Sequence, residues 1–226
     1  MLKSVYFSIS TDLTKPDLSS LCFDLNKNGS KKLNLVSTDR VRLSCVSTDI
    51  NLEDTKRFVV PRVSIAEIIK FEPTVMLINK DTDNKLYFKS ENNFGILYFS
   101  TVLTNSEYPD IYAYLTNPFD EAKKISLDKS EFIKALKRIR LTRGENKEGT
   151  LDLSENKVIV STTDSRNKAK ECIKATTESL GNFSFNVDYV LEYLNQEIDS
   201  KIDFKLLENK CIIFDKPSYR HVLSIN

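Results

Sequence analysis

Five positively charged side chains cluster in one short segment of the chain, and phosphate binding is the chemistry that such a cluster can perform. The segment from about 128 to 143 has a helical apolar pattern, and three of the cations lie at positions i, i+3 and i+4 on one face. Cations near the carboxyl end of a helix also complement its dipole, which is the alternative interpretation. The cluster predicts a sequence-independent, salt-sensitive contact with a polyanion. Its members are Lys134, Lys137, Arg138, Arg140 and Arg143.

The sequence offers no constellation of catalytic residues. The single histidine, His221, lies in a strand-like stretch without a serine or cysteine pattern, which is typical of a structural histidine. The glycines form no phosphate-binding loop motif. Asp81 and Asp83 could serve a metal ion or a nuclease, but they lie in a short turn where Asp is expected anyway. We therefore expect a protein that is not an enzyme, with no metal and no cofactor.

Bulk composition places few limits on partners. The chain has 226 residues, and 33 Lys and Arg against 32 Asp and Glu leave a net charge of +1. No apolar run approaches the roughly 18 residues of a membrane span, and no secretory signal is present, so a cytoplasmic location without membrane contact is expected. The four cysteines are scattered and predict buried, reduced thiols: Cys22, Cys45, Cys172 and Cys211.

The chain partly repeats itself under a shift of 125 positions, which is 183 minus 58. Without a gap, Phe58–Ile69 lies over Phe183–Leu194, and the same shift places Leu33–Asp39 over Val158–Asp164. A period this long exceeds that of solenoid repeats and predicts two copies of a whole domain. We expect the boundary near the polar stretch Asn117–Ala122, which gives domains 1–118 and 119–226.

Helical signals are few, and most of the chain has strand patterns. Helices are expected over about 62–71 after Pro61, over 187–194 after the N-cap Asn186, and over 128–143. Polar turn residues separate the strands, as hairpins of antiparallel sheets require. The fold class is therefore α+β, with two short helices in each domain. Strands are expected at 32–36, 75–79, 86–89, 95–103, 150–153, 158–161, 202–206, 211–214 and 221–225.

The two copies differ at their starts. Ala135–Leu141 has its counterpart in Met1–Phe7. The preceding residues, Lys124–Lys134, include a strand and the first helical turns and have no counterpart in the first copy. The chain is therefore expected to begin partway into its first repeat.

Several motifs resemble those of the bacterial DNA polymerase III beta subunit, the sliding clamp of replication. They occur in family order, cover nearly the whole chain, and match the second and third domains of that clamp. In the first copy, Val36–Leu43 is similar to the family's Ala-Thr-Asp-Gly-His-Arg-Leu, Val60–Arg62 to its Val-Pro-Arg, and Glu107–Asp110 to its Phe-Pro-Asp-Tyr segment. In the second copy, Leu151–Asn156 is similar to its Ser-Glu-Asn segment and Phe185–Leu191 to its Phe-Asn-x-x-Tyr-Leu-Leu segment.

This resemblance implies a DNA-clamp fold and a ring of six similar domains whose helices line a hole for double-stranded DNA. Two domains per chain would then require a homotrimer, provided that the rotation per subunit closes the ring. Arg62 and Lys3 join the cation cluster as residues expected to face DNA. The alternative is a clamp-like binding module that forms no ring and sequesters clamp-binding peptides.

The resemblance also implies a pocket between the two domains for short hydrophobic peptides of DNA polymerase and the clamp loader. For each residue taken alone, packing at a domain junction is the alternative. Arg40 and Val41 replace the family's Gly-His, Ala113 and Tyr114 replace an Arg-Val pair, and the family's Met-Pro-Met-Arg-Leu-like tail is absent before the last residue. The expected lining is Leu18, Thr38, Arg40, Arg42, Leu43, Pro109, Asn186, Tyr189, Val222 and Leu223.

Overall fold

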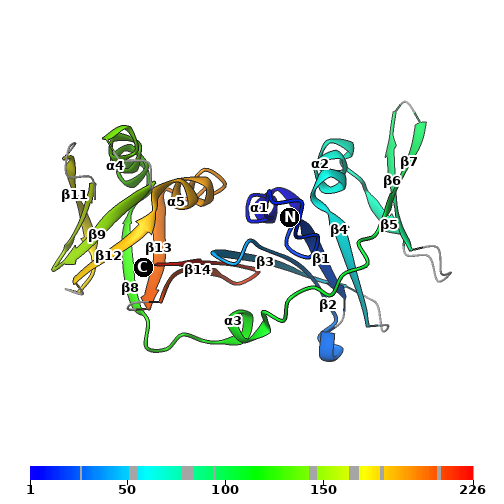
Figure 1. Cartoon of the computed structure of the whole chain (residues 1–226), viewed down its shortest axis with the longest axis horizontal. Coiled ribbons are helices and arrows are strands. Elements are labelled where there is room, and N and C mark those ends of the chain that lie inside the picture. The colour runs from blue at the N-terminus through cyan, green and yellow to red at the C-terminus, as the bar shows by residue number, and fades with distance from the viewer. Residues whose placement is uncertain are drawn as a thin grey trace. The chain divides into compact units, whose positions relative to one another are not determined.

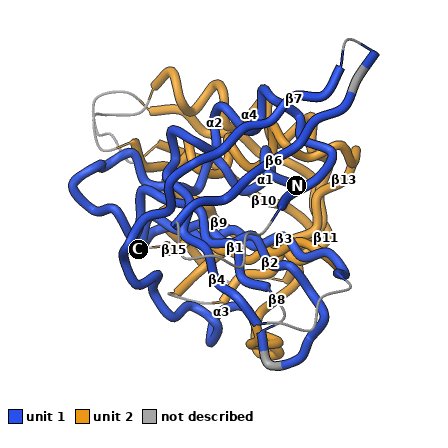
Figure 2. Tube along the Cα trace, turned by 90° about the vertical axis from the view of Figure 1, so that its right-hand side faces the viewer, with its two compact units in different colours: residues 1–115 blue, residues 116–226 orange. Residues whose placement is uncertain are grey.

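The structure is a computed structural model that describes residues 1–225 except 26, 51–54, 78–83, 94, 143–146, 163–167, 179–180 and 208–209. The chain divides into two compact units, residues 1–115 and 116–226 (Figure 2). Both units combine antiparallel strands with short helices (Figure 1). The α+β class expected from the sequence is therefore confirmed.

Unit 1 contains two separate antiparallel sheets, in the strand orders β3-β2-β1-β4 and β5-β6-β7. Helix α1 packs against α2, and both pack against the first sheet. The elements are α1 (Leu2–Tyr6), β1 (Ser20–Leu25), the short 3-10 helix η1 (Lys27–Gly29), β2 (Lys32–Thr38), β3 (Arg42–Asp49), β4 (Lys56–Pro61), α2 (Arg62–Phe71), β5 (Val75–Leu77), β6 (Lys85–Asn92), β7 (Gly95–Val102) and α3 (Tyr112–Thr116), which crosses the division between the units.

Unit 2 contains one continuous antiparallel run of strands, in the order β12-β9-β10-β11-β8-β13-β14-β15. Helix α4 lies beside α5 and packs on β10 and β11 (Figure 1). The elements are β8 (Lys123–Asp128), α4 (Lys129–Thr142), β9 (Glu148–Ser154), β10 (Lys157–Thr162), β11 (Lys170–Thr176), β12 (Gly181–Asn186), α5 (Val187–Leu194), β13 (Lys201–Leu207), β14 (Cys211–Lys216) and β15 (Tyr219–Ser224).

The internal repeat of the sequence is a repeat of structure. Strands β10 and β12 begin 125 residues after β2 and β4 (157 minus 32 and 181 minus 56), and α5 begins 125 residues after α2 (187 minus 62). The sheet order β3-β2-β1-β4 of unit 1 corresponds to β11-β10-β9-β12 in unit 2. The two units therefore share an order of elements at the period found in the sequence.

Strand β8 distinguishes the two units. It pairs with β13 along its whole length and with the end of β11, so it joins the two sheets of unit 2 into one. No strand in the described part of unit 1 takes this position, and α1 has 5 residues where α4 has 14. Strand β8 and the first turns of α4 contain residues 124–134, which have no counterpart in the first copy of the sequence repeat.

Local signals explain the three helices that the sequence predicts. The side chain of Asp128 accepts a hydrogen bond of 2.8 Å from the backbone N–H of Glu131 and caps α4. In α5, the side chain of Asn186 accepts from two backbone N–H groups of the first turn. Helix α2 begins after Pro61 and ends at Glu72, which has φ 49° and ψ 60° in the left-handed region. Each cap compensates backbone groups that a helix end leaves without partners.

The core of unit 2 depends on a close approach between β9 and α5. A Cβ atom added to Gly149 would lie 2.8 Å from Cγ2 of Val187 and 3.6 Å from Cγ2 of Ile139. Because real Cβ atoms do not approach that closely, only glycine fits at this position of β9. The absent side chain lets both helices sit directly on the sheet. Phe132 of α4 then stacks on Phe204 of β13, with ring centroids 6.3 Å apart.

The predicted burial of one cysteine was wrong, and several helices and strands were not predicted from the sequence. All four cysteines are free, but Cys172 is exposed on β11, which contradicts the expectation that every thiol is buried. It occupies an outward position of a strand whose residues alternate between the two faces. His221 is fully buried in β15 and stacks on Tyr193 at 5.2 Å. A strand was expected within Lys124–Lys134, where β8 lies, but no separate strand was expected for β1, β3, β4, β11 or β12, and no helix for η1 or α3.

Two leucines of α4 provide a test of its buried face. Leu136 is 0% exposed and Leu141 is 86% exposed. We expect Leu136→Ala to lower the free energy of unfolding by about 2–5 kcal/mol, because it removes buried methyl groups and leaves a cavity. Leu141→Ala should change it by less than about 0.5 kcal/mol. Urea denaturation of both variants measures the difference, and equal losses would contradict the packing described for α4.

The thiols provide a second test. Burial raises the pKa of Cys22 to about 12 and that of Cys211 to about 11, which suppresses their reactive thiolate forms. Cys45 is buried as well, whereas Cys172 is exposed. Titration of the native protein with Ellman's reagent at neutral pH should give one fast thiol, and all four should react after denaturation. Rapid reaction in a Cys172→Ser variant would contradict this assignment.

Candidate nucleic-acid and peptide interfaces

The predicted cation cluster lies on the exposed face of α4. Its apolar stripe of Phe132, Ala135, Leu136 and Ile139 is buried, which directs the charged side chains to the opposite face. Arg143 lies outside the described residues. The cluster members that the structure places together on this exposed face are Lys134, Lys137, Arg138 and Arg140.

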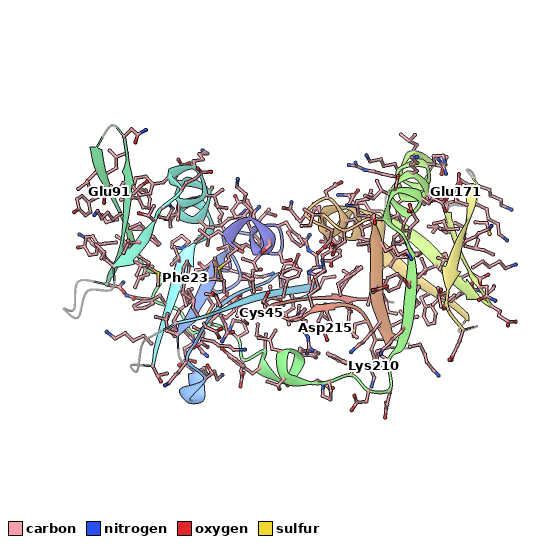
Figure 3. The ribbon with its side chains drawn as sticks, turned by 180° about the vertical axis from the view of Figure 1, so that it is seen from behind. Phe23, Cys45, Glu91, Glu171, Lys210 and Asp215 are labelled. Carbon is pink, nitrogen blue, oxygen red and sulfur yellow. The ribbon has the colours of Figure 1, made fainter. Side chains whose placement is uncertain are left out.

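Acidic side chains neutralise two of these cations. The guanidinium of Arg138 donates two hydrogen bonds to the carboxylate of Glu171, labelled on β11 in Figure 3, at 2.6 and 2.8 Å. The hydrogen bond lowers the pKa of Glu171 and raises that of Arg138. Arg140 forms an ion pair with Asp188 of α5 at 3.0 Å.

The two lysines of the cluster retain their charges for other partners. In the described part of the chain, neither Lys134 nor Lys137 forms an ion pair. Both lie on the outward face of α4, one helical turn apart, where their ammonium groups can reach phosphate oxygens. Sequence reasoning counted the cations of this helix but did not identify the acidic partners, because these come from other elements.

The two cations expected in unit 1 differ in their surroundings. Arg62 donates hydrogen bonds to the backbone carbonyls of Tyr6 and Ile9, and its guanidinium lies 4.3 Å from the centre of the Tyr6 ring. It thereby ties the start of α2 to the segment after α1. Lys3 is exposed on α1. Arg62 therefore has a structural role in unit 1, and Lys3 has the more accessible charge.

In unit 1, several predicted peptide-binding residues belong to the tight turn between β2 and β3. The carboxylate of Asp39 accepts hydrogen bonds from the backbone N–H groups of Val41 and Arg42, at 3.0 and 2.7 Å. It also binds the Arg42 guanidinium at 2.9 Å, with both side chains largely buried. Thr38 donates to the Arg42 carbonyl at 2.6 Å. Arg40 is exposed at the tip with φ 78°.

The remaining predicted residues of unit 1 are aliphatic. Leu18 and Leu43 are buried in the core of unit 1, and Pro109 is partly exposed in the segment between β7 and α3. Because Leu18 and Leu43 are almost inaccessible in this structure, they would contribute mainly the floor of a peptide site.

In unit 2, the predicted residues fall on the start of α5 and on β15. Asn186 caps α5, and its side-chain oxygen accepts from the N–H groups of Asp188 at 3.0 Å and Tyr189 at 3.3 Å. Tyr189 is partly exposed, whereas Val222 and Leu223 are buried. The predicted set is therefore spread over the β2–β3 turn and two other segments of unit 1, which carry Leu18 and Pro109, and over α5 and β15 in unit 2.

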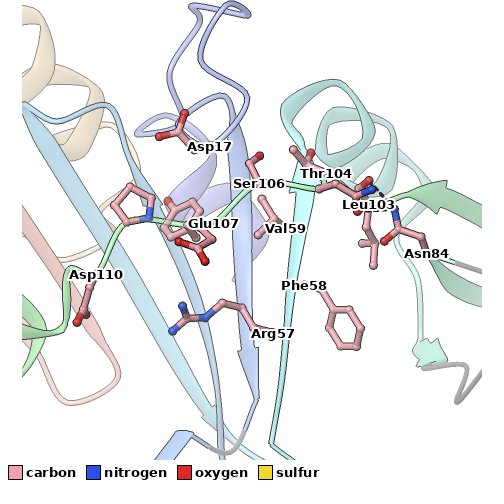
Figure 4. A pocket seen from close by; sticks show the side chains of 13 residues that line it. Asp17, Arg57, Phe58, Val59, Asn84, Leu103, Thr104, Ser106, Glu107 and Asp110 are labelled. Carbon is pink, nitrogen blue, oxygen red and sulfur yellow. Dashed lines mark hydrogen bonds between the residues drawn. The ribbon is translucent and has the colours of Figure 1, made fainter. Parts of the chain in front are cut away.

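Sequence reasoning missed a cavity of about 910 Å³ in unit 1 (Figure 4). Strand β4 and the segment after β7 form its walls, and the carboxylates of Asp17, Glu107 and Asp110 line it. Its one guanidinium, that of Arg57, binds Asp24 at 2.8 Å. The excess of carboxylates makes this cavity unsuited to DNA phosphates. No sequence signal marked it, because it is formed by residues of β4 and of loops that are distant from one another in sequence.

The described residues contain no group of three or more His, Cys, Asp or Glu side chains that could hold a metal ion. Asp81 and Asp83, the only metal or nuclease candidates of the sequence, lie outside the described residues. Among the helices described, none is long and apolar enough to cross a membrane.

Comparison with known families decides how these surfaces are interpreted. Residues 1–110 match the DNA polymerase III beta subunit, central domain, and residues 117–222 match the DNA polymerase III beta subunit, C-terminal domain. The chain belongs to the DNA polymerase III beta subunit family. The resemblance found in the sequence motifs is confirmed.

Individual relatives agree with this family. The chain is 26% identical over 205 residues to the beta sliding clamp of Bacillus subtilis, covering 86% of this chain and 52% of that protein. It is 25% identical over 206 residues to that of Staphylococcus aureus strain Mu50, with 85% and 52% covered. The chain thus spans about half the length of the curated relatives it matches.

Solved structures share the fold. A DNA polymerase sliding clamp from Pseudomonas aeruginosa superposes with a TM-score of 0.85 at 19% identity, covering 100% of this chain and 64% of that one. DNA polymerase III subunit beta from Borrelia burgdorferi gives a TM-score of 0.86 at 21% identity, with 100% and 59% covered. Both support a clamp-type arrangement of elements.

The ion pair of the β2–β3 turn generates a test in this DNA polymerase III beta family member. Asp39→Ala would leave the Arg42 guanidinium without its carboxylate in a largely buried position. We expect a loss of about 2–4 kcal/mol in the free energy of unfolding. The control is Glu67→Ala, which removes the exposed ion pair with Lys70 on α2 and should cost far less, because water screens exposed charges. Similar losses in urea denaturation would contradict the structural role of Asp39.

Proposed function

We propose that this chain is a DNA sliding clamp, a non-catalytic processivity factor that encircles duplex DNA and tethers a DNA polymerase. The observation that carries the proposal is the match of both units, in order, to consecutive domains of the DNA polymerase III beta subunit. The exposed lysines of α4 add a surface suited to phosphates. The protein acts in the cytoplasm and needs no cofactor.

Contacts with DNA are weak and independent of base sequence. Lys134 and Lys137 make the main contacts with phosphates, while Arg138 and Arg140 are shared with Glu171 and Asp188. Lys3 adds a contact from unit 1. Phosphate contacts carry no sequence information, so a clamp held by few of them can move along the duplex.

Partner proteins bind through short hydrophobic peptides. DNA polymerase and a clamp loader supply these peptides to the predicted residues at the β2–β3 turn in unit 1 and at α5 and β15 in unit 2. The buried side chains of Leu18, Leu43 and Val222 form the aliphatic floor, and Tyr189 offers a partly exposed aromatic ring with a polar end. Arg40, exposed at the turn, influences which peptides are accepted.

Ring closure requires several copies. Because the chain contributes two clamp-type units, a six-domain ring forms from three chains with head-to-tail contacts. Light scattering at micromolar concentration and low salt should therefore give the mass of a trimer. A monomer under these conditions would exclude the ring and favour a module that sequesters clamp-binding peptides.

Salt titration tests the DNA surface. Replacing both Lys134 and Lys137 by Gln should weaken binding and reduce the slope of log K against log salt by about 2, since each phosphate contact contributes about 0.9. Glu171→Gln should have the opposite effect and raise the slope by up to about 1, because it releases Arg138. Fluorescence anisotropy with a short duplex measures the binding constant K of the unchanged chain and of both variants at each salt concentration.

The matched control replaces two exposed lysines of unit 2, Lys157 on β10 and Lys210 in the turn between β13 and β14, by Gln. It removes the same charge away from α4 and should leave the slope unchanged. An equal decrease in the control would show that only net charge matters. Encirclement is tested separately by retention on nicked circular DNA and its loss on linear DNA, alongside primer extension with a polymerase. Equal retention on both forms would contradict encirclement.

A further inference from the structure

Helix α4 packs on one face of β10 and β11, and alternate side chains of both strands lie on the opposite face (Figure 1). Glu171 of β11 is on the side of α4, where its carboxylate binds Arg138. Because successive side chains of a strand point to opposite faces, its neighbour Cys172 lies on the side away from α4, and it is exposed. We call the side of β10 and β11 that carries Cys172 the outer face.

The strand register places three lysines on the outer face. Lys157 of β10 lies directly opposite Lys174 of β11, and Ile159 lies directly opposite Cys172. Lys170 is two residues before Cys172 and shares its face. The three lysines are exposed and Ile159 is partly exposed. The outer face therefore has a small apolar centre with cations on both sides of it along β11.

The opposed pair of lysines is specific to unit 2. The pair 125 residues earlier in unit 1, in the same register between β2 and β3, is Lys32 opposite Asp49. Opposite charges at such positions attract each other, whereas like charges directly opposite each other destabilise a sheet. The pair Lys157 and Lys174 thus lacks the neutralisation that its counterpart has, and an anion beside it would relieve the repulsion.

Positive charge is in excess on this part of the sheet. In the described part of the chain, none of the three lysines of the outer face forms an ion pair. The residues of β9 that pair with Lys157 and Ile159 are Ser154 and Asp152. They add one carboxylate, that of Asp152, which accepts a hydrogen bond of 3.3 Å from the Ser154 hydroxyl. Three cations against one anion favour a negatively charged partner.

The spacing of the lysines along β11 indicates the form of this partner. Lys170 and Lys174 are four residues apart, which is about 13 Å in a strand that rises about 3.3 Å per residue. An extended peptide has the same rise, so carboxylates at its positions i and i+4 can reach both lysines. Its residue i+2 then lies over Cys172 and Ile159, where an aliphatic side chain would be shielded from water.

The composition of the two strands distinguishes an acidic peptide from a nucleic acid. Single-stranded nucleic acids bind proteins through basic grooves that also carry aromatic side chains for base stacking. Neither β10 nor β11 contains an aromatic residue. The observations therefore favour carboxylates of a polypeptide over phosphates.

We propose that the outer face of β10 and β11 is a docking surface for an extended acidic segment of a partner protein. The segment has carboxylates at positions i and i+4 and an aliphatic residue at i+2. The carboxylates pair with Lys170 and Lys174, with Lys157 as a third cation beside Lys174. This surface includes none of the residues assigned to DNA or to clamp-binding peptides, so the proposal does not depend on clamp activity.

Peptide binding to the full-length chain at low salt tests the surface without DNA or polymerase. The probe is a fluorescently labelled Asp-Glu-Ser-Leu-Ser-Glu-Asp peptide, and anisotropy should show saturable binding. Replacing both Lys170 and Lys174 by Gln should weaken binding about fivefold or more, because two ion pairs are lost. The matched control, Lys134→Gln with Lys137→Gln, removes the same charge from α4 and should change the affinity less than about twofold.

Three outcomes would overturn the proposal. One is the absence of saturable binding, and another is an equal loss in the two double variants, which would show that only net charge matters. The third concerns a scrambled peptide of the same composition with leucine at one end, which should bind more weakly than the probe because its leucine cannot cover Ile159. Equal affinity of the two peptides would contradict the spacing.

The native thiol of Cys172 allows the position of the peptide to be tested without a new cysteine, since the other three cysteines are buried. The trapping peptide is Asp-Glu-Ser-Cys-Ser-Glu-Asp, with its thiol activated as a mixed disulfide with thionitrobenzoate. Its neutral counterpart has Asn and Gln in place of Asp and Glu. Absorbance of the released thionitrobenzoate gives both exchange rates, and their ratio cancels the intrinsic reactivity of Cys172.

The acidic peptide should react at least about threefold faster than the neutral one with the unchanged chain, because the lysines attract it. The ratio should fall toward one when Lys170 and Lys174 are both replaced by Gln. A ratio that this change does not affect would show that the peptide binds elsewhere. Anisotropy with a labelled single-stranded oligonucleotide provides the last comparison: if the same change weakens its binding but not that of the acidic peptide, the surface binds nucleic acid and the proposal is overturned.

Discussion

The packing of two helices on one sheet face is the contact on which each unit depends. In unit 2, this contact requires Gly149, because any side chain there would collide with Val187 at the start of α5. The same contact buries Phe132, Leu136 and Ile139 of α4. With a period of 3.6 residues, burial of one stripe necessarily exposes the other, so the arrangement that builds the core also presents Lys134 and Lys137.

Sequence predicted those parts of the fold that depend on local signals. Helices α2, α4 and α5 have caps and apolar stripes, and strands such as β14 contain a continuous apolar run next to turn residues. Strands such as β3 and β11 are polar at many positions and become strands because they pair with neighbours that are themselves well specified. Pairing is a tertiary property, and a single sequence reveals it only weakly.

The residues of the candidate interfaces could be predicted from the sequence, but the ion pairs that some of them form could not. Arg138 meets Glu171, which is 33 residues away in sequence, and the pair forms only because α4 lies across β11. Arg42 was expected to contact a peptide, yet Asp39 already holds its guanidinium within the β2–β3 turn. Several family-like residues, among them Pro61 and Asn186, set helix starts. Such positions specify the fold, which explains why the family is detectable at about one quarter identity.

The bridging position of β8 gives the two units different mechanical properties. Force applied across unit 2 passes through a continuous ladder of backbone hydrogen bonds, because β8 connects β11 to β13. In the described part of unit 1, no such strand joins the sheets β3-β2-β1-β4 and β5-β6-β7, so side-chain packing and isolated hydrogen bonds, such as that from the Thr104 N–H to the Val59 carbonyl, resist their sliding past each other. Packing contacts yield gradually, whereas a strand ladder sheared along its length resists until several bonds break together. Unit 1 is therefore the compliant half of the chain, and deformation under load concentrates there.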